Sequence, residues 1–389
     1  MVGLGGAVAS TAAAGVEILR RGSNRMDGLP LAGVSVPGLP AYDELVFGGW
    51  DLNGQSLADA ASEHRVLNDN QMKETEAGLS NIIPWPAVAS TEFCRRITGA
   101  NARPVDGHRA AIEAIVADIT RFKAANDLDS VVMVNLASTE RTPEDSPALR
   151  TTDAFERALD ANDDHIGPAM LYARAAIEAG VPYGNFTPSV AADAPALAEM
   201  ARKRGVPVAG KDGKTGQTLK TVLAPMLRAR ALHVDGWFST NILGNRDGEA
   251  LRDKDSLGSK LGTKGSVLDS ILGYPVEDHI VDIQYYRPRG DDKEAWDNID
   301  VSGFLGQRMQ IKVNMLCKDS ILAAPLVLEI ARLLDLAKTR GEAGAQEQMS
   351  LFFKAPQTNH GRAPVHAFHQ QEDMLAEWLG VKLAPVAAE

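Results

Sequence analysis

The sequence predicts an α/β fold built on a doubly wound parallel sheet, with an inserted α+β segment. Amphipathic helices alternate with short apolar strands through the first half of the chain, a pattern typical of parallel sheets with helices on both faces. From about residue 218 this alternation gives way to longer amphipathic pieces. A long apolar helix that begins at Asp319 then returns the chain to the first pattern.

The chain opens with a Gly-rich turn that runs into an Ala-rich helix, in the stretch MVGLGGAVASTAAAGVEILRRG. The turn resembles the start of a dinucleotide-binding βαβ unit, in which glycines let the backbone approach a diphosphate at the helix N-terminus. Gly3, Gly5 and Gly6 fit that unit, and Val8 stands where its third glycine would be. Taken alone, this partial match fits a tight structural turn as well as a cofactor site.

The strand before the turn is reduced to Met1 and Val2, which leaves open whether the native N-terminus lies upstream of Met1. Ser10 or Thr11 is the expected cap of the first helix. The next predicted strand, residues 31–36, ends without the acidic residue that usually holds the adenosine ribose. That contact must therefore come from another part of the chain.

Three later segments are predicted as buried parallel strands that end in polar residues. They lie within residues 130–140 (SVVMVNLASTE), 180–189 (GVPYGNFTPS) and 205–217 (GVPVAGKDGKTGQ). Because α/β sheets bind ligands beyond the carboxyl ends of their strands, we expect the site at these polar ends.

The composition fits an ordinary globular protein of 389 residues, with 44% hydrophobic and 23% charged residues and a mean hydropathy of -0.15. No apolar run approaches the roughly 20 residues needed to span a bilayer, and the N-terminus lacks the basic and apolar regions of a secretory signal. A net charge of -11 argues against a nucleic-acid partner. Cys94 and Cys317 show neither disulfide nor zinc spacing, so we expect a cytoplasmic protein.

Three motifs fail their spacing tests. The loop GKDGKTGQT is not a P-loop, because Val208 stands where the first motif glycine is required. The stretch DKDSLGSKLGTK has the rhythm of a calcium loop, but Lys264 replaces the glutamate at its twelfth position. His360, His366 and His369 have no carboxylate at ligand spacing, so we expect a solvated turn there and not a metal site.

Four lysines interrupt apolar or small-residue contexts, and such a cluster of ammonium groups suits an anionic substrate that exchanges protons. Lys354 follows residues 351–353 (LFF), so we expect a packed stem and a lowered pKa, the state in which lysine acts as base or acid. Lys260 and Lys264 would share one helix face and repel each other unless an anion lies between them. Lys293 is the fourth. Any one of them, taken alone, is more simply a solvated surface charge.

The ordered motifs closely resemble those of the myo-inositol-1-phosphate synthase family, in its shorter archaeal and bacterial form. They are VGLGGAVAST, GGWDL, VNLASTE, NFTPS, GKDGKTGQTLKT, NILGNRDGE, SKLGTK, DDKEAWD, GFLG, DSILAAPL and FFKAP. The resemblance implies a Rossmann-type NAD-binding domain at residues 1–217, an α+β domain for catalysis and oligomerisation at 218–318, and a return to the Rossmann domain at 319–389. It also implies a homotetramer.

The implied activity is the redox-neutral cyclisation of D-glucose 6-phosphate to 1L-myo-inositol 1-phosphate. In the family, C5 is oxidised with NAD, the C6 enolate closes the ring on C1, and the C5 ketone is reduced again. Lysines suit this chemistry because it needs proton shuttles and charge stabilisation. Homologues that cyclise another hexose phosphate, such as fructose 6-phosphate, to a five-membered ring share the motifs and remain the alternative. Some members also use a divalent or monovalent cation, and no ligand set in the sequence decides this.

The resemblance assigns catalytic roles to Lys260, Lys264, Lys293, Lys354, Asp247 and Asp319. Of these, Lys354 would transfer a proton at C5, whereas Lys260 and Lys264 would meet the phosphate and the reacting oxygens. The implied NAD contacts are Gly3, Gly5, Gly6, Ala7, Val8, Asp51, Ser138, Thr139, Thr187, Ser189 and Asp212. Two departures fall in the cofactor loop: Lys211 replaces the usual Asp or Asn, and QTLKT is one residue short.

Overall fold

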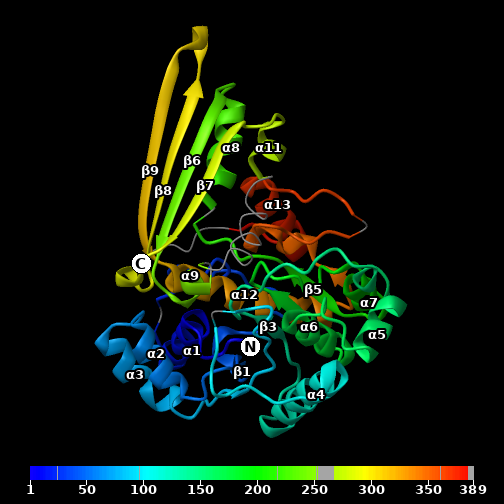
Figure 1. The fold of residues 1–389 in the computed structure, drawn as a ribbon. Coiled ribbons are helices and arrows are strands. Elements are labelled where there is room, and N and C mark those ends of the chain that lie inside the picture. The colour runs from blue at the N-terminus through cyan, green and yellow to red at the C-terminus, as the bar shows by residue number, and fades with distance from the viewer. Residues whose placement is uncertain are drawn as a thin grey trace.

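The computed structural model describes residues 1–23, 25–95, 97–216, 218–250, 252, 267–359 and 361–383. An open parallel sheet with its helices forms the lower body of the molecule, and a second sheet of four strands rises above it (Figure 1). The predicted doubly wound sheet with an added α+β part is therefore confirmed. Across these described ranges, no helix is both long and apolar enough to cross a membrane.

The open sheet is parallel throughout. In spatial order its members are β2 (Trp85–Pro86), β1 (Trp50–Asp51), Val2, β3 (Met133–Asn135), β4 (Tyr183–Asn185), β5 (Pro207–Gly210) and β10 (Gly344–Ala345). Val2 bridges to Trp50 on one side and to Asn135 on the other, so it takes the place of a central strand. The chain order reverses direction between Val2 and β3, and this switch point is where such sheets bind ligands.

Alternate residues of the strands face two separate cores. Met133 and Val208 belong to one, and Val134 and Ala209 to the other. The first core is covered by α4 (Gly107–Ala125), α5 (Thr152–Asp160), α6 (Pro168–Glu178) and α7 (Pro195–Lys203). The second is covered by α12 (Asp319–Thr339), η5 (Glu347–Phe352) and α13 (Phe368–Leu379). A sheet buried on both faces explains why these strands are apolar runs without alternation.

The first helix, α1 (Ala7–Arg20), begins one residue after Gly6, which is its N-cap. The expectation of a cap at Ser10 or Thr11 was wrong, because both lie buried inside the helix and the Ser10 hydroxyl donates to the Gly6 carbonyl at 2.9 Å. Helices α2 (Leu57–His64) and α3 (Asp69–Leu79) pack against α1. The remaining short helices of the described chain are η1 (Tyr42–Glu44), η2 (Pro147–Leu149), η3 (Arg287–Arg289), η4 (Phe304–Gly306) and α9 (Arg246–Ala250).

Residues 31–36 do not form the predicted strand; residues 31–33 form a turn, and residues 34–36 have no regular secondary structure. Leu31 and Val36 are instead buried against α12, and the Leu31 N–H donates to the Glu329 carboxylate at 3.0 Å. The second strand of the sheet is β1, which ends at Asp51. The acidic residue that the sequence did not place after residue 36 is therefore the last residue of a different, shorter strand.

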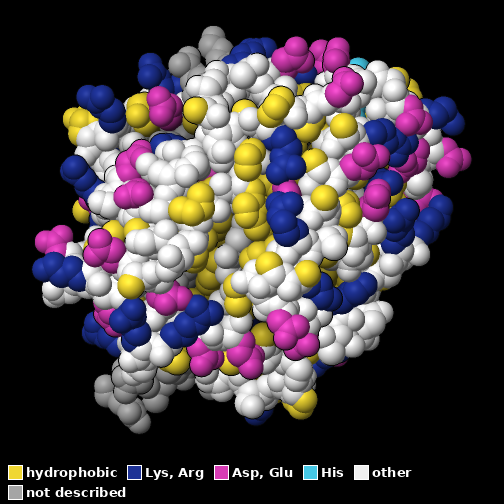
Figure 2. All heavy atoms as spheres, turned by 90° about the horizontal axis from the view of Figure 1, so that it is seen from below, with side chains coloured by type: hydrophobic (Ala, Val, Ile, Leu, Met, Phe, Trp, Pro, Cys, Tyr) yellow, Lys and Arg dark blue, Asp and Glu magenta, His cyan; other side chains and the backbone are white. Residues whose placement is uncertain are grey.

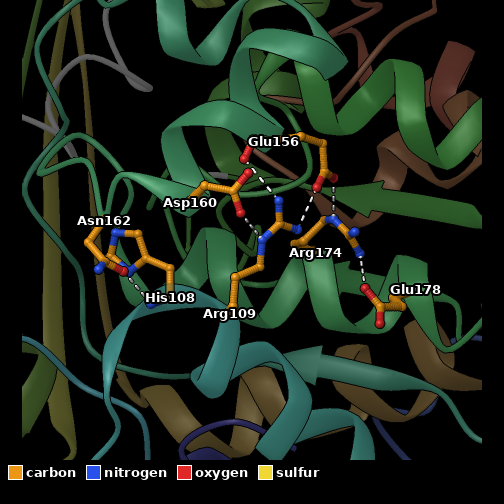
Figure 3. Close-up of polar contacts among 7 residues, drawn as sticks. All are labelled: His108, Arg109, Glu156, Asp160, Asn162, Arg174 and Glu178. Carbon is orange, nitrogen blue, oxygen red and sulfur yellow. Dashed lines mark hydrogen bonds and ion pairs between the residues drawn. The ribbon is translucent and has the colours of Figure 1, made fainter.

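A network of ion pairs joins α4, α5 and α6 (Figure 3). The Glu156 carboxylate on α5 accepts from Arg109 on α4 at 2.6 Å and from Arg174 on α6 at 2.9 Å. Arg174 is 4% exposed and also reaches Glu178 at 2.5 Å. Because one carboxylate serves two guanidinium groups, this network fixes the three helices relative to one another.

The second sheet has the order β7 (Asp278–Tyr285), β6 (His233–Leu243), β8 (Asp292–Ser302) and β9 (Arg308–Lys318). Helices α8 (Thr218–Ala229) and α11 (Val267–Leu272) cover one face, where Trp237 and Ile299 are buried. The opposite face carries Phe238 and Trp296 in edge contact, with exposed Ile280 and Leu316 on the outer strands. Within the described residues, this second face therefore lacks the covering helices of the first.

A cavity of about 540 Å³ lies at the amino ends of the strands in the open sheet. Met1, Gly48 and Met133, which precede or begin central strands, help to line it. Figure 2 views the molecule from below and shows hydrophobic side chains in a hollow of that face, with Lys, Arg, Asp and Glu around it.

Candidate functional site

A cavity of about 870 Å³ opens at the carboxyl ends of the strands, over the switch point of the sheet. Its volume is at the upper end of the range for small-molecule and cofactor sites. The cavity is lined by the Gly-rich turn, by the loops after β1, β3, β4 and β5, and by residues from β8, α9 and α12. Both sheets thus contribute to a single site.

The Gly-rich turn fits the diphosphate of a dinucleotide. Gly3 has φ +82°, and a Cβ there would lie 3.0 Å from the carbonyl of Leu136, so the turn approaches β3 as closely as glycine allows. Within the described residues no side chain caps α1, and Gly6 and Ala7 at its start line the cavity. Uncapped N–H groups and the helix dipole favour an anion at this position.

Asp51, the last residue of β1, lies next to the Gly-rich turn and bonds to it. Its Oδ2 accepts the Gly5 N–H and its Oδ1 accepts the Asn53 N–H, both at 2.9 Å. Burial raises the pKa of this carboxyl. The hydrogen bonds from the backbone N–H groups of Asn53 and Gly5 act in the opposite direction and lower the pKa. A carboxylate at the end of the second strand is the usual partner of an adenosine ribose.

Lys354 and Asp212 form a buried pair in the cavity wall. The Lys354 ammonium donates to the Asp212 carboxylate at 2.7 Å, and the two residues are 8% and 3% exposed. A short antiparallel ladder aligns them, because the Lys354 N–H donates to the Asp212 carbonyl and the Lys214 N–H to the Phe352 carbonyl. The packed stem expected for Lys354 is confirmed. The adjacent carboxylate compensates for the desolvation of its ammonium group.

Lys293 and Asp319 form a second pair, on the side of the cavity that belongs to the second sheet. The Lys293 ammonium lies 3.3 Å from the Asp319 carboxylate, which also accepts from the Thr215 hydroxyl at 3.2 Å. Asp319 is the first residue of α12, where a negative charge is favoured by the helix dipole. The neighbouring Asp291 accepts the Ser320 N–H at 3.0 Å and so caps the same helix.

Most of the residues predicted for NAD line the same cavity. They are Gly3, Gly6, Ala7, Val8, Asp51, Ser138, Thr139, Thr187 and Asp212, together with the catalytic candidates Lys293, Asp319 and Lys354. The other two predicted contacts, Gly5 and Ser189, do not line the cavity. The Gly5 N–H donates to Asp51, and the Ser189 hydroxyl accepts the Glu140 N–H at 3.0 Å. Lys260, Lys264 and the side chain of Asp247 lie outside the described residues. The unusual Lys211 pairs with Asp193 at 2.7 Å.

Sequence reasoning missed Glu140, a carboxyl in the cavity wall. Burial raises the pKa of Glu140 to about 8. The hydrogen bond from the Ala169 N–H at the start of α6 and the charge of Arg141 act in the opposite direction. Burial therefore favours the protonated form of Glu140. A signal was present in the sequence, since an acidic residue directly follows the small polar residues after β3.

Lys214 and His64 were also missed. Lys214 is 3% exposed, burial lowers its pKa to about 7, and its amine donates to Gln371 on α13. His64 lines the cavity and contacts the Gly5 carbonyl. Nothing in the local sequence distinguishes these two side chains from surface charges.

No metal centre emerges from the described residues, where no group of three or more His, Cys, Asp and Glu side chains could hold an ion. Burial, followed by the charge of Lys214, lowers the pKa of His366. His360 lies outside the described part of the chain.

Comparisons with known proteins agree with this geometry. The family model described as myo-inositol-1-phosphate synthase matches residues 34–380. The chain is 40% identical to inositol-3-phosphate synthase 1 of Bacteroides thetaiotaomicron, over 98% of this chain and 93% of that protein. It is 32% identical to the probable inositol 3-phosphate synthase isozyme 3 of Arabidopsis thaliana, over 88% of this chain and 72% of that protein.

Solved structures give the same result. The inositol-3-phosphate synthase of Caenorhabditis elegans superimposes with a TM-score of 0.91 at 26% identity, covering 100% of this chain and 88% of that one. A myo-inositol-1-phosphate synthase-related protein of Thermotoga maritima gives a TM-score of 0.81 at 25% identity, with 98% of each chain covered. With its Gly-rich turn, its lysine–carboxylate pairs and this similarity over nearly its whole length, the chain belongs to the myo-inositol-1-phosphate synthase family.

Proposed function

We propose that this protein is an NAD-dependent inositol-3-phosphate synthase, which converts D-glucose 6-phosphate into 1L-myo-inositol 1-phosphate without net oxidation or reduction. The observation that carries the proposal is the buried Lys354–Asp212 pair, which lies in the same cavity as the Gly-rich turn. The curated relatives named above are inositol-3-phosphate synthases. The family membership therefore favours this substrate over fructose 6-phosphate.

The residues around the turn would hold the cofactor. The uncapped start of α1 would receive the diphosphate, and Asp51 would face the adenosine ribose. NAD, when bound, accepts a hydride from C5 of the sugar and later returns it. The nicotinamide half would extend towards Thr187 and Asp212, at the ends of β4 and β5.

Lys354 would move the proton of the C5 hydroxyl. Its Nζ lies 2.7 Å from Asp212 Oδ1, so the carboxylate can hold one proton of the ammonium while the amine accepts the proton from the sugar. The reverse transfer restores the hydroxyl at the end of the cycle. Burial of both side chains keeps this exchange away from bulk water.

Lys293 would stabilise negative charge that develops on the sugar oxygens during enolisation and ring closure, because its ammonium faces the cavity from β8. Asp319 and Thr215 would hold that ammonium in place. Lys260 and Lys264 are proposed for the phosphate and the reacting oxygens on the family resemblance alone. Whether a divalent or monovalent cation assists them is tested below.

We also propose a homotetramer in the cytoplasm. The uncovered face of the second sheet supports the assembly, since Leu316 is 64% and Ile280 51% exposed. Phe304 and Leu305, at the turn between β8 and β9, are 87% and 79% exposed. Light scattering after size exclusion should give a tetramer for the wild type and a smaller species for Leu316→Glu. The spacing of Cys94 and Cys317, which fits neither a disulfide scaffold nor a zinc site, supports a reducing compartment.

The function is tested by product NMR after incubation with NAD and either glucose 6-phosphate or fructose 6-phosphate. We expect an inositol phosphate from glucose 6-phosphate, no product from fructose 6-phosphate, and no accumulation of NADH. Parallel reactions with a chelator, a divalent ion, or potassium or ammonium would identify any cation requirement. Unchanged glucose 6-phosphate under every condition would refute the proposed function.

A further inference from the structure

Both backbone polar groups of Gly5 are held by side chains, one in the peptide before its Cα and one in the peptide after it. Its N–H donates to Asp51 Oδ2 at 2.9 Å, and its carbonyl oxygen lies 2.9 Å from His64 Nε2. Since a carbonyl can only accept, His64 carries its proton on Nε2 in this contact. The two side chains come from β1 and from the end of α2, so two separate elements meet at one residue of the turn.

We propose that His64 is a positioning residue for the cofactor-binding turn, holding the Gly5 carbonyl so that the following N–H groups of the turn face the cavity. The inference rests on the proposed use of NAD. It assigns His64 no contact with the reacting atoms.

The end of α2 is well placed for this role. Leu57, Ala58 and Ala61 of α2 are buried in one cluster with Leu4 of the turn. Arg65 ends the helix in the left-handed conformation at φ 54°, with its N–H bonded to the Ala61 carbonyl. The helix is therefore fixed against the turn by apolar packing, and His64 adds the directional contact.

The turn needs this support because glycines restrict its conformation little. Gly3, Gly5 and Gly6 lose more backbone freedom on ordering than other residues would. An anion-binding turn gains affinity when its N–H groups are ordered before the ligand arrives. The bond from Asp51 fixes the peptide plane before the Gly5 Cα and the contact with His64 fixes the plane after it, whereas Asp51 alone would leave the second plane free to rotate.

A matched set of variants tests the inference through NAD affinity, measured by calorimetry on the purified full-length protein without hexose phosphate. His64→Ala removes the donor, and His64→Gln places an amide N–H near the position of Nε2. His165→Ala is the control, because His165 pairs with Asp163 in the loop between α5 and α6 and does not line the cavity.

We expect His64→Ala to raise the Kd for NAD about tenfold, the effect of losing one hydrogen bond to a partly buried carbonyl. His64→Gln should recover most of that loss, and His165→Ala should bind NAD as the wild type does. At saturating NAD, the kcat of His64→Ala should remain close to the wild-type value, because a positioning residue of the turn acts on binding.

Two results would overturn the inference: an unchanged Kd in His64→Ala, or equal weakening in the alanine and glutamine variants, which would assign the effect to the ring and not to its hydrogen bond. The readout is independent of turnover. A chain that binds NAD but forms no inositol phosphate would therefore refute the proposed function alone. A wild-type chain that binds no NAD would overturn both.

Discussion

The Lys354 ammonium and the Asp212 carboxylate lie 2.7 Å apart in a wall of the cavity, although 142 positions separate them in the chain. Both are nearly inaccessible to water. Removal of either partner should lower the free energy of unfolding by about 3–5 kcal/mol, because the remaining charge stays buried without its counter-ion. Denaturant unfolding of Lys354→Met and Asp212→Asn measures this effect.

The double variant Lys354→Met with Asp212→Asn separates folding from catalysis. Since no buried charge is left unpaired, we expect its stability to recover towards the wild-type value. Its rate of inositol phosphate formation should remain about 10²- to 10⁴-fold below wild type, the usual contribution of a general acid or base. Recovery of activity together with stability would contradict the proton-transfer role of Lys354.

Gly3→Ala should weaken NAD binding and destabilise the protein. Its Cβ would meet the Leu136 carbonyl at 3.0 Å, so β3 and the turn would have to separate. Gly22→Ala is the matched control: Gly22 has φ +87°, but a Cβ there meets nothing within 4 Å. Both variants carry the backbone strain of about 1–2 kcal/mol, measured by chemical denaturation, and only Gly3→Ala should also raise the Kd for NAD.

Glu140→Gln should change how stability depends on pH. The pKa of Glu140 is raised to about 8 by burial, so the folded protein retains a proton that the unfolded chain loses near pH 4.5. Wild-type stability should therefore contain a contribution that is complete below pH 4.5 and is lost as the pH rises to about 8. Glutamine keeps the acceptor for the Ala169 N–H and has no proton to lose.

The stability difference between Glu140→Gln and wild type should thus grow with pH by roughly 5 kcal/mol and level off above pH 8. Urea unfolding at several pH values measures it in the absence of NAD. Glu199→Gln is a control in which the stability difference should change with pH in the opposite direction, because contacts with Lys203 and Thr152 lower the pKa of Glu199. A constant difference for Glu140→Gln would mean that folding does not raise the pKa of Glu140.

Arg174→Met should destabilise the packing of α4, α5 and α6 (Figure 3). Arg174 is buried between Glu156 and Glu178. We expect a loss of about 3 kcal/mol, at the low end for a broken buried pair, because Glu178 keeps some access to water. The exposed pair Arg150–Asp145 gives the comparison: Arg150→Met should cost less than about 1 kcal/mol. Equal thermal unfolding midpoints for Arg174→Met and Arg150→Met would contradict a stabilising role of the ion-pair network.

The strands that pair in the middle of the open sheet were predictable, because burial on both faces leaves continuous apolar runs. The segments that became β3, β4 and β5 show this pattern. Residues 31–36 have the same local pattern, yet their apolar side chains cover α12. Their partner Glu329 lies nearly 300 positions away, and no local pattern encodes such a contact.

The site was predictable where unusual neighbours accompany a charge, as the aromatic residues do before Lys354. Glu140, Lys214 and His64 lack such neighbours. Their environments arise from segments that meet only in the folded chain: the start of α6, Gln371 on α13, and the Gly5 carbonyl. Burial and pKa at these positions are properties of tertiary structure.

The place of β10 and Lys354 in the chain has a consequence for synthesis on the ribosome. The Gly-rich turn, β1 and Asp212 emerge early, whereas β10 and Lys354 belong to the last 50 residues. Until these residues arrive, the edge of β5 lacks its neighbour and the Asp212 carboxylate lacks its ammonium partner. On the role proposed for Lys354, a nascent chain that can already order the cofactor turn would not yet move the C5 proton, and activity would require that β10 and Lys354 have joined the sheet and the cavity wall.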